Sequence, residues 1–170
     1  MSVKRLLVVV DMQRDFVSGS LGTKEAQAIL PAVCELIARE RGVGSAVAFT
    51  LDTHEENYLA TQEGRLLPVR HCIRGTDGWN LADGLDPGDA RVFEKGAFGS
   101  VELAEYARSF DEVLLCGVCT DICVVSNALL IKAFSPETKV MVAERACAGV
   151  TPEAHAAAIA TMKSCQIEIV

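Results

Sequence analysis

Three cysteines lie within the eight residues Cys116-Gly-Val-Cys-Thr-Asp-Ile-Cys123, where an apolar strand-like run meets a helical pattern. This places Cys123 in the first turn of the predicted helix. Unpaired N–H groups and the helix dipole stabilise an anion there, and they lower a cysteine pKa from its usual value of about 8.5. We therefore expect Cys123 to be a reactive thiol suited to nucleophilic catalysis.

Two other apolar segments each end at an ionisable residue. LLVVVDMQRDF runs into Asp11, and VFEKGAFGS runs into Lys95. In open α/β sheets, ligands bind at the carboxyl ends of the strands, so an acid, a lysine and a cysteine can converge there. Taken singly, each has a simpler explanation. An Asp after a strand is most often a turn or cap residue, a Lys before Gly is usually a solvated charge, and most cysteines at helix starts are inert.

The combination VVVDMQRDF, EKGAFGS and GVCTDICV resembles the isochorismatase-like cysteine hydrolases, the superfamily that includes the nicotinamidases. The resemblance covers nearly the whole chain, and its specificity comes from finding all three segments together. It implies that Asp11, Lys95 and Cys123 are a catalytic triad. Cys119 is a rival nucleophile, but the matching motif places the catalytic thiol after Asp-Ile. The family also implies a cis peptide between Val118 and Cys119.

The implied activity is hydrolysis of a small carboxamide through a thioester. Cys123 attacks the carbonyl carbon, Asp11 takes the thiol proton and returns it to departing ammonia, and Lys95 balances the charge. The oxyanion is expected to accept hydrogen bonds from the backbone N–H groups of Cys119 and Cys123. Nicotinamide is the best single substrate, and another small amide, carbamoyl or ureido compound is the alternative within the superfamily.

Other functions remain open at this stage. A non-catalytic small-molecule binding domain on the same fold is one, although the intact triad argues against it. A redox protein using Cys119 and Cys123 is another, and it requires a reversible disulfide. An isochorismate-type vinyl-ether hydrolase is disfavoured, because that chemistry does not use the thiol.

The segment FTLDTHEENYLATQEGRLLPVRHC resembles the metal site of nicotinamidases. By that resemblance the ligands are Asp52 and His54 of the D-x-H pattern together with His71, and Glu63 is the candidate remaining ligand. Imidazole and carboxylate groups suit zinc, iron or manganese, and no organic cofactor is expected. The alternative is a set of polar residues in a hydrated loop. The second histidine that often follows D-x-H is missing, since Tyr58 and its neighbours occupy that region.

The expected substrate wall also departs from the nicotinamidase pattern. An aromatic residue is expected just before the proline that precedes the downstream histidine, and here that residue is Leu67. Phe16 remains as one aromatic contact. Trp79 or Tyr58 is expected to supply the other from the loop. The missing aromatic residue is the feature that favours the alternative substrates, and nicotinamide stays the first expectation.

Strands and helices must alternate to position these residues. Apolar runs predict strands near 5–10, 46–51, 91–94, 112–117 and 138–143, with a possible last strand at 166–170. Continuous apolar runs such as LLVVV are typical of strands buried on both faces. The alternation predicts an α/β fold, a three-layer α/β/α sandwich with a mostly parallel, doubly wound sheet of about six strands.

Helical patterns fill several intervals between these strands. Apolar residues recur at helical spacing over 30–37, and Pro31 is tolerable in a first turn. The expected N-caps are Ser100, Thr151, and Thr120 or Asp121 for the helix that carries the reactive cysteine. The polar, Gly- and Pro-rich stretch 52–89 is long for a structureless connection, and such loops are usually functional. We expect it to form the mouth of the site.

Composition sets further limits. With 170 residues, half of them apolar, the chain is expected to form one domain over 1–170. A net charge of -7 argues against a nucleic-acid partner. The apolar runs are far shorter than the roughly 20 residues of a membrane span. The amino terminus turns acidic too early for a signal peptide, so a cytoplasmic protein is expected.

The seven cysteines do not indicate a disulfide framework, because their number is odd and several lie in apolar surroundings. The C-x2-C-x3-C spacing from Cys116 to Cys123 is superficially like that of a metal cluster, but no second C-x2-C or His pair follows. The expected partner is a small-molecule amide. By resemblance a homo-oligomer is also expected, with the apolar segment 167–170 available to pack at an interface.

Overall fold

The computed structural model describes residues 3–170, which build a six-stranded parallel sheet. The strand order is β3-β2-β1-β4-β5-β6, so the winding reverses between β1 and β4. The strands are β1 (Arg5–Val10), β2 (Ala46–Asp52), β3 (Arg91–Lys95), β4 (Glu112–Val118), β5 (Lys139–Ala148) and β6 (Glu168–Ile169). The predicted three-layer α/β fold and its strands are confirmed.

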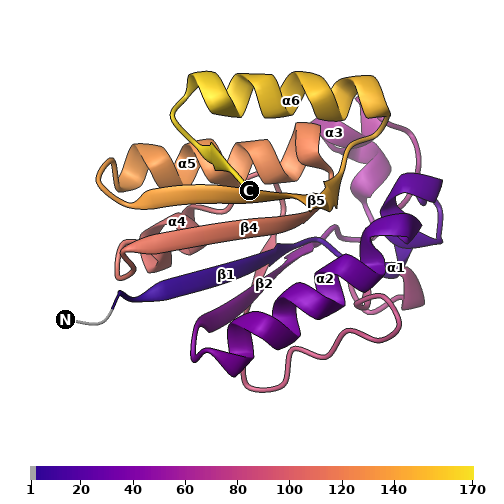
Figure 1. Ribbon diagram of the computed structural model, residues 1–170. Helices are drawn as coiled ribbons and strands as arrows, with labels where there is room; N and C mark the ends of the chain where they lie inside the picture. The colour runs from indigo at the N-terminus through magenta and orange to yellow at the C-terminus, as the bar shows by residue number, and fades with distance from the viewer. Residues whose placement is uncertain (1–2) are drawn as a thin grey trace.

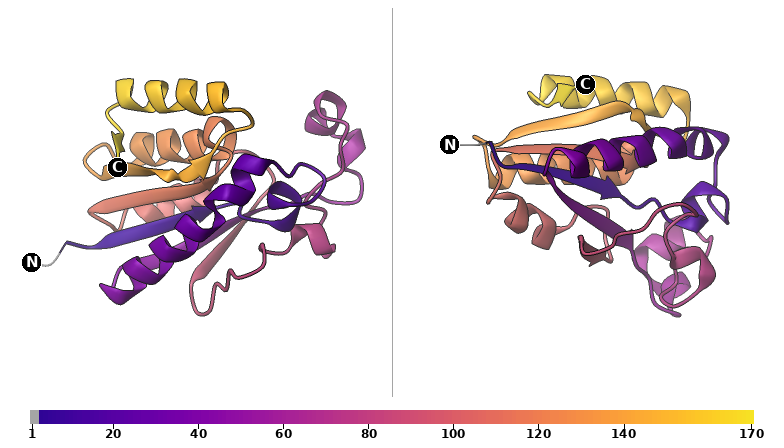
Figure 2. Two further views of the ribbon diagram at one scale, coloured as in Figure 1. Left: turned by 45° about the vertical axis from the view of Figure 1, so that its right-hand side comes forward. Right: turned by 60° about the horizontal axis from the view of Figure 1, so that its bottom comes forward.

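Helices cover both faces of this sheet. The α-helices are α1 (Arg14–Val17), α2 (Lys24–Gly42), α3 (Gln62–Leu66), α4 (Val101–Ala107), α5 (Val125–Phe134) and α6 (Pro152–Ser164). Helix α2 packs on one face, whereas α4 and α5 pack on the other, and α6 lies beside α5 near β5 and β6 (Figures 1 and 2). Helices of both layers pack against central strands such as β1, in which Leu6 to Val10 are fully buried.

Two of the predicted helix starts are confirmed. The Ser100 hydroxyl accepts a hydrogen bond from the Leu103 N–H, and the Thr151 hydroxyl accepts one from the Ala154 N–H. These bonds satisfy N–H groups that have no partner within the helix.

The expected start of the helix after β4 is wrong, because a π-helical turn, η3 (Thr120–Val124), precedes α5. Cys119 occupies the cap position, and its carbonyl oxygen accepts hydrogen bonds from the N–H groups of Ile122 and Val124. Neither Thr120 nor Asp121 caps the turn with its side chain. Both side chains instead contact residues of the segment that follows β5.

The position of Pro31 also differs from the prediction. Helix α2 begins at Lys24, since the Thr23 hydroxyl accepts a hydrogen bond from the Ala26 N–H and caps it there. Pro31 therefore lies inside the helix instead of in its first turn. A proline there removes one backbone hydrogen bond.

Most of the stretch 52–89 covers the carboxyl ends of the strands, at the right of Figure 1, and its last residues return to the start of β3, where the Asp86 and Pro87 carbonyl oxygens accept hydrogen bonds from Arg41. It contains two 3-10 turns, η1 (Tyr58–Ala60) and η2 (Asp77–Trp79), in addition to α3. A parallel bridge between His54 and Ile73 ties its two halves together. Local turns and this bridge therefore order the segment, and residues from its first half line the cavities described below.

Gly117 allows β4 to approach β1 closely. Its φ is +114°, and a Cβ atom at this position would lie 2.1 Å from the Val10 carbonyl oxygen. Only glycine fits such a position. The chain leaving β4 consequently passes close to the end of β1, where Asp11 follows.

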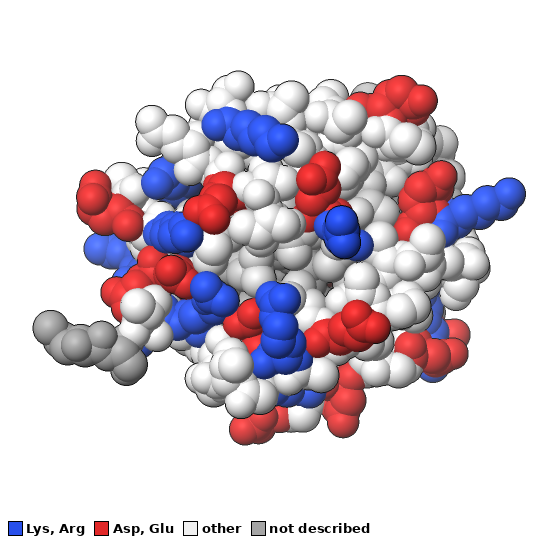
Figure 3. Space-filling view, in the orientation of Figure 1, with Lys and Arg blue, Asp and Glu red and all other residues white. Residues whose placement is uncertain are grey.

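None of the helices in residues 3–170 is long and apolar enough to cross a membrane. On the face shown in Figure 3, basic side chains are interspersed with acidic ones and form no continuous stripe.

Candidate active site

Asp11 follows the last residue of β1 and is fully buried. Its φ of +48° is in the left-handed region, which is uncommon for a residue other than glycine. The Thr50 hydroxyl donates a 2.5 Å hydrogen bond to Oδ1, which orients the carboxylate. Burial raises the pKa of Asp11, and the opposing effect of Lys95 is smaller.

Lys95 ends β3, and its side chain reaches across β2 toward the centre of the sheet. Its ammonium nitrogen lies 2.6 Å from Asp11 Oδ2, 3.4 Å from Asp52 Oδ1 and 3.4 Å from the Cys123 sulfur. The residue is only 4% exposed. Burial alone would lower the pKa of Lys95, but the Asp11 carboxylate raises it, followed by Cys123 and Asp52, so Lys95 is a cation.

Cys123 lies in the π-helical turn and is 5% exposed. Burial raises the pKa of its thiol well above the ordinary value, and the Asp11 carboxylate raises it further, whereas Lys95 lowers it. The prediction that a helix start lowers this pKa is therefore wrong. Loss of water and the nearby Asp11 carboxylate both favour the protonated thiol over the thiolate.

The three side chains thus form one contact group. Lys95 contacts both Asp11 and Cys123. It comes from β3, which is separated from β1 in the sheet by β2. Asp11 Oδ2 accepts no hydrogen bond of ordinary geometry within residues 3–170, even though the ammonium lies near. A carboxylate that can accept a proton and the Lys95 ammonium therefore lie together beside the Cys123 thiol.

The peptide bond between Val118 and Cys119 is cis, as the family resemblance implied. It joins the end of β4 to the π-helical turn that carries Cys123.

The four candidate metal ligands also come together. One ligand atom from each of Asp52, His54, Glu63 and His71 lies within 4.8 Å of the others. Asp52 Oδ2 is 3.0 Å from His54 Nε2 and 3.4 Å from His71 Nε2. Glu63 Oε1 is 3.6 Å and 3.8 Å from the same two nitrogens. The residues therefore converge from the end of β2, from α3 and from the loop beyond it.

The donor set fits a divalent cation. His71 Nδ1 lies 2.8 Å from the Val69 carbonyl oxygen, so this nitrogen is the N–H donor and Nε2 faces the carboxylates. His54 Nε2 is buried and has no hydrogen-bond partner within the described chain. The Tyr58 ring packs against both imidazoles, with centroids 4.6 and 5.0 Å away, and limits their movement. Two imidazoles and two carboxylates suit zinc, iron or manganese.

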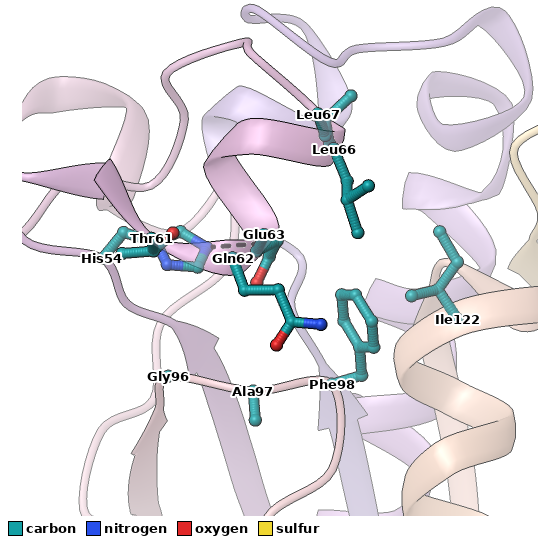
Figure 4. A pocket seen from close by; sticks show the side chains of 10 residues that line it. All are labelled: His54, Thr61, Gln62, Glu63, Leu66, Leu67, Gly96, Ala97, Phe98 and Ile122. Atoms are coloured by element: carbon teal, nitrogen blue, oxygen red, sulfur yellow. Dashed lines mark ion pairs between the residues drawn. The ribbon is translucent and has the colours of Figure 1, made fainter. Parts of the chain in front are cut away.

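A cavity of about 220 Å³ joins the two groups. Its lining comprises Phe16, Leu21, Thr23, Asp52, Glu63, Leu67, His71, Phe98, Cys119, Ile122, Cys123 and Val150. A second cavity of about 530 Å³ adjoins it, sharing Glu63, Leu67, Phe98 and Ile122. Figure 4 shows the Gln62 and Phe98 side chains pointing into this outer cavity, and its dashed line marks the His54–Glu63 ion pair.

The predicted substrate wall is corrected in part. Phe16 and Leu67 line the inner cavity, but Trp79 does not. The Trp79 indole N–H donates to the Thr53 hydroxyl, and the Arg74 guanidinium lies over its ring, so these contacts direct it elsewhere.

Tyr58 is likewise absent from the lining of both cavities, since its ring packs behind the histidines. Phe98, which the sequence analysis did not single out, supplies the second aromatic side chain. Its position three residues after Lys95, within EKGAFGS, was the available signal.

A family model described as the isochorismatase domain matches residues 5–170. The crystal structure of the pyrazinamidase of Pyrococcus horikoshii in complex with zinc is 34% identical, with a TM-score of 0.87 over 98% of both chains. The nicotinamidase/pyrazinamidase of Mycobacterium tuberculosis is 29% identical over 98% of each chain. The N-carbamoylsarcosine amidase of Thermoplasma acidophilum is 26% identical, with a TM-score of 0.81 over 98% of this chain and 95% of the other. Because the family match covers nearly the whole sequence, the chain belongs to the isochorismatase family.

Proposed function

We propose that this chain, an amidohydrolase of the isochorismatase family, hydrolyses a small carboxamide through a thioester on Cys123. One observation carries the proposal: the Lys95 ammonium lies 2.6 Å from the Asp11 carboxylate and 3.4 Å from the Cys123 sulfur, beside a cavity of about 220 Å³. The relatives named as nicotinamidase, pyrazinamidase and amidase support the reaction class.

The first step forms the thioester. Asp11 accepts the thiol proton as the sulfur attacks the carbonyl carbon, and the C–S bond forms as the carbonyl π electrons move to oxygen. Lys95 stabilises the sulfur anion as its charge develops, because the ammonium is already in contact. The N–H groups of Cys119 and Cys123 donate to the oxyanion. The tetrahedral species then collapses, the C–N bond breaks, and Asp11 returns the proton to departing ammonia.

The second step repeats this chemistry with water. Asp11 accepts a proton from the water that attacks the thioester, the C–S bond breaks, and the sulfur recovers the proton as the acid leaves. The net reaction consumes one amide and one water and yields a carboxylic acid and ammonia. Burial suits Asp11 to this exchange, because its raised pKa allows it to hold a proton between the two transfers.

Asp52, His54, Glu63 and His71 are the residues that would hold a divalent metal next to this cavity. When bound, such a cation supplies Lewis-acid chemistry that orients a polar substrate atom or polarises water. The zinc complex of the Pyrococcus horikoshii pyrazinamidase supports the assignment of a metal site.

Nicotinamide is the substrate we propose first. The inner cavity is small, its walls are largely apolar, and its lining includes Phe16 and Phe98, aromatic residues of the type that packs against a flat ring. Leu67 in place of an aromatic residue favours the second candidate, a small carbamoyl or ureido compound that needs no ring stacking. The likeness to N-carbamoylsarcosine amidase supports this alternative.

Ammonia release tests the proposal directly. Purified protein is assayed on nicotinamide, pyrazinamide and N-carbamoyl amino acids, beside the variants Cys123→Ala and Cys165→Ala. Cys165 is exposed and serves as the matched control. We expect activity that Cys123→Ala abolishes and Cys165→Ala preserves. Turnover that survives in Cys123→Ala, or absence of turnover on every amide after metal addition, would overturn the thioester mechanism.

Homo-oligomerisation and a cytoplasmic location remain predictions. Sedimentation velocity of the purified chain tests the first. Fractionation of the native host, with detection by an antibody against the chain, tests the second.

A further inference from the structure

The π-helical turn that carries Cys123 is fastened to the segment between β5 and α6. Thr120 Oγ1 lies 2.8 Å from His155 Nδ1, in the first turns of α6. The Asp121 carboxylate accepts a 3.0 Å hydrogen bond from the Val150 N–H, just before that helix. Two consecutive residues of the turn are therefore held by one neighbouring segment.

Neither Thr120 nor His155 belongs to the cavities beside Cys123. Thr120 is fully buried, and the His155 side chain is 20% exposed, with its Nε2 atom 3.9 Å from the Glu144 carboxylate. A role for these residues in the reaction must therefore act through the backbone that carries the nucleophile.

Gly149 brings the two segments close enough for these bonds. A Cβ atom at Gly149 would lie 2.8 Å from the backbone nitrogen of His155 and 2.9 Å from the Asp121 Oδ1 atom. Contacts this short essentially exclude a larger residue without a shift of the backbone. Glycine at position 149 therefore allows the start of α6 to pack directly against the π-helical turn.

The contact between the start of α6 and the π-helical turn affects the distance from the Cys123 sulfur to Asp11 and Lys95. Asp11 and Lys95 extend from β1 and β3 and take their places from the sheet. The sulfur takes its place from the turn, which follows the last residue of β4 and one connecting residue. A displacement of about 1 Å between reacting groups can cost about a hundredfold in rate, so a fixed turn matters for the sulfur.

We propose that His155 is a positioning residue, which through its hydrogen bond to Thr120 sets the place of the Cys123 sulfur relative to Asp11 and Lys95. The proposal rests on the proposed function only in taking Cys123 as the nucleophile. His155 touches neither the reacting atoms nor the cavity, so it positions and does not itself exchange protons with substrate.

Four variants test the hydrogen bond itself. Thr120→Val and His155→Leu remove it, whereas Thr120→Ser and His155→Asn keep a group that can form it. Thr161→Val is the matched control, because the Thr161 hydroxyl lies on the same helix and, among residues 3–170, bonds only to the Ala157 carbonyl. Thermal unfolding of every variant separates loss of folding from loss of positioning.

The first readout is steady-state kinetics of ammonia release. We expect Thr120→Val and His155→Leu each to lower kcat about tenfold with KM changed less than twofold, since the cavity walls are untouched. The serine and asparagine variants should recover most of kcat. The double variant Thr120→Val/His155→Leu should be no slower than either single variant, because both remove the same contact.

The second readout requires no amide substrate. Mass spectrometry follows alkylation of Cys123 by iodoacetamide, with the exposed Cys165 as internal reference. Slower alkylation of Cys123 relative to Cys165 in Thr120→Val and His155→Leu, with recovery in the conservative variants, supports positioning even if nicotinamide is not the substrate. Unchanged kcat and unchanged alkylation in folded variants would overturn the proposal. If kcat and the alkylation rate fall no further in Thr120→Val and His155→Leu than in Thr161→Val, the proposal would also be overturned.

Discussion

The Lys95 ammonium lies 2.6 Å from the Asp11 carboxylate, and the two residues are 4% and 0% exposed. A buried ion pair replaces water around each charge, so removal of one partner leaves the other charge buried without its nearest counter-charge. The pair therefore affects folding stability as well as the proposed chemistry.

Replacement of one member of this pair should destabilise the fold more than replacement of both. We expect Lys95→Met and Asp11→Asn each to lower the free energy of unfolding by about 3 to 5 kcal/mol. The double variant should lose less than either single variant, because no unpaired charge is left buried. Urea denaturation of the three variants and wild type measures the coupling. Strictly additive losses would show that the two charges do not depend on each other.

Removal of a candidate ligand should lower metal content. We expect His54→Ala and Asp52→Asn to reduce the zinc, iron or manganese retained after dialysis against a weak chelator, because the four ligand atoms act together. Inductively coupled plasma mass spectrometry measures the metal directly. His155→Asn is the control, since this histidine lies outside the ligand group. A wild-type chain that retains no more metal than His54→Ala would contradict the assignment.

The ends of β1, β2 and β3 could be predicted from sequence, because each of these apolar runs stops at an ionisable residue, whereas β5 continues past Glu144 to Ala148. Asp11, Asp52 and Lys95 all follow or end such runs, and parallel strands bring their carboxyl ends to one edge. The direction of the Cys123 pKa shift could not be predicted in this way. A helix start is visible locally, but the burial and the Asp11 carboxylate that raise this pKa come from distant parts of the chain.

Loop side chains were the hardest to predict. Trp79 is a plausible ring-stacking residue by type, yet its hydrogen bond to Thr53 and its contact with Arg74 direct it away from the cavity. Phe98 has the right type and a favourable position after Lys95, but the cavity that it lines is built from α3 and the π-helical turn, which are brought to one place only in the folded chain. The sequence also does not indicate that Thr120–Val124 forms a π-helical turn instead of an ordinary α-helical one.

Gly117 should tolerate no side chain. We expect Gly117→Ala to lower the free energy of unfolding by more than about 2 kcal/mol, since φ is +114° and the new Cβ would overlap the Val10 carbonyl oxygen. Gly42→Ala is the control, because no atom lies within 4 Å of a Cβ at the end of α2. It should leave stability unchanged or raise it by up to about 1 kcal/mol. Equal stability of the two variants in urea denaturation would refute the close fit of β4 against β1.

Glu40 should make stability depend on pH. This buried carboxylate accepts a 2.7 Å hydrogen bond from Ser45 and a 3.0 Å one from Arg39, and it lies 3.6 Å from the Arg5 guanidinium. Burial alone would raise the pKa of Glu40, but these three partners more than offset it and hold the pKa below its ordinary value. A carboxyl whose folded-state pKa is depressed stabilises the fold above its unfolded pKa, and this contribution is lost as the pH falls through the folded value.

Glu40→Gln should therefore lower the free energy of unfolding at pH 7 by about 1 to 3 kcal/mol, the usual loss for a hydrogen-bonded charge. The difference from wild type should narrow as the pH falls below about 4.3, the ordinary pKa of a glutamate. Urea denaturation at pH 7, 5 and 3.5 measures the free energy of unfolding of both proteins and so gives this difference. Glu35→Gln is the control on the exposed face of α2 and should match wild type at each pH. A difference that widens on acidification would mean that the pKa of Glu40 in the folded chain lies above its ordinary value, and that burial outweighs its three partners.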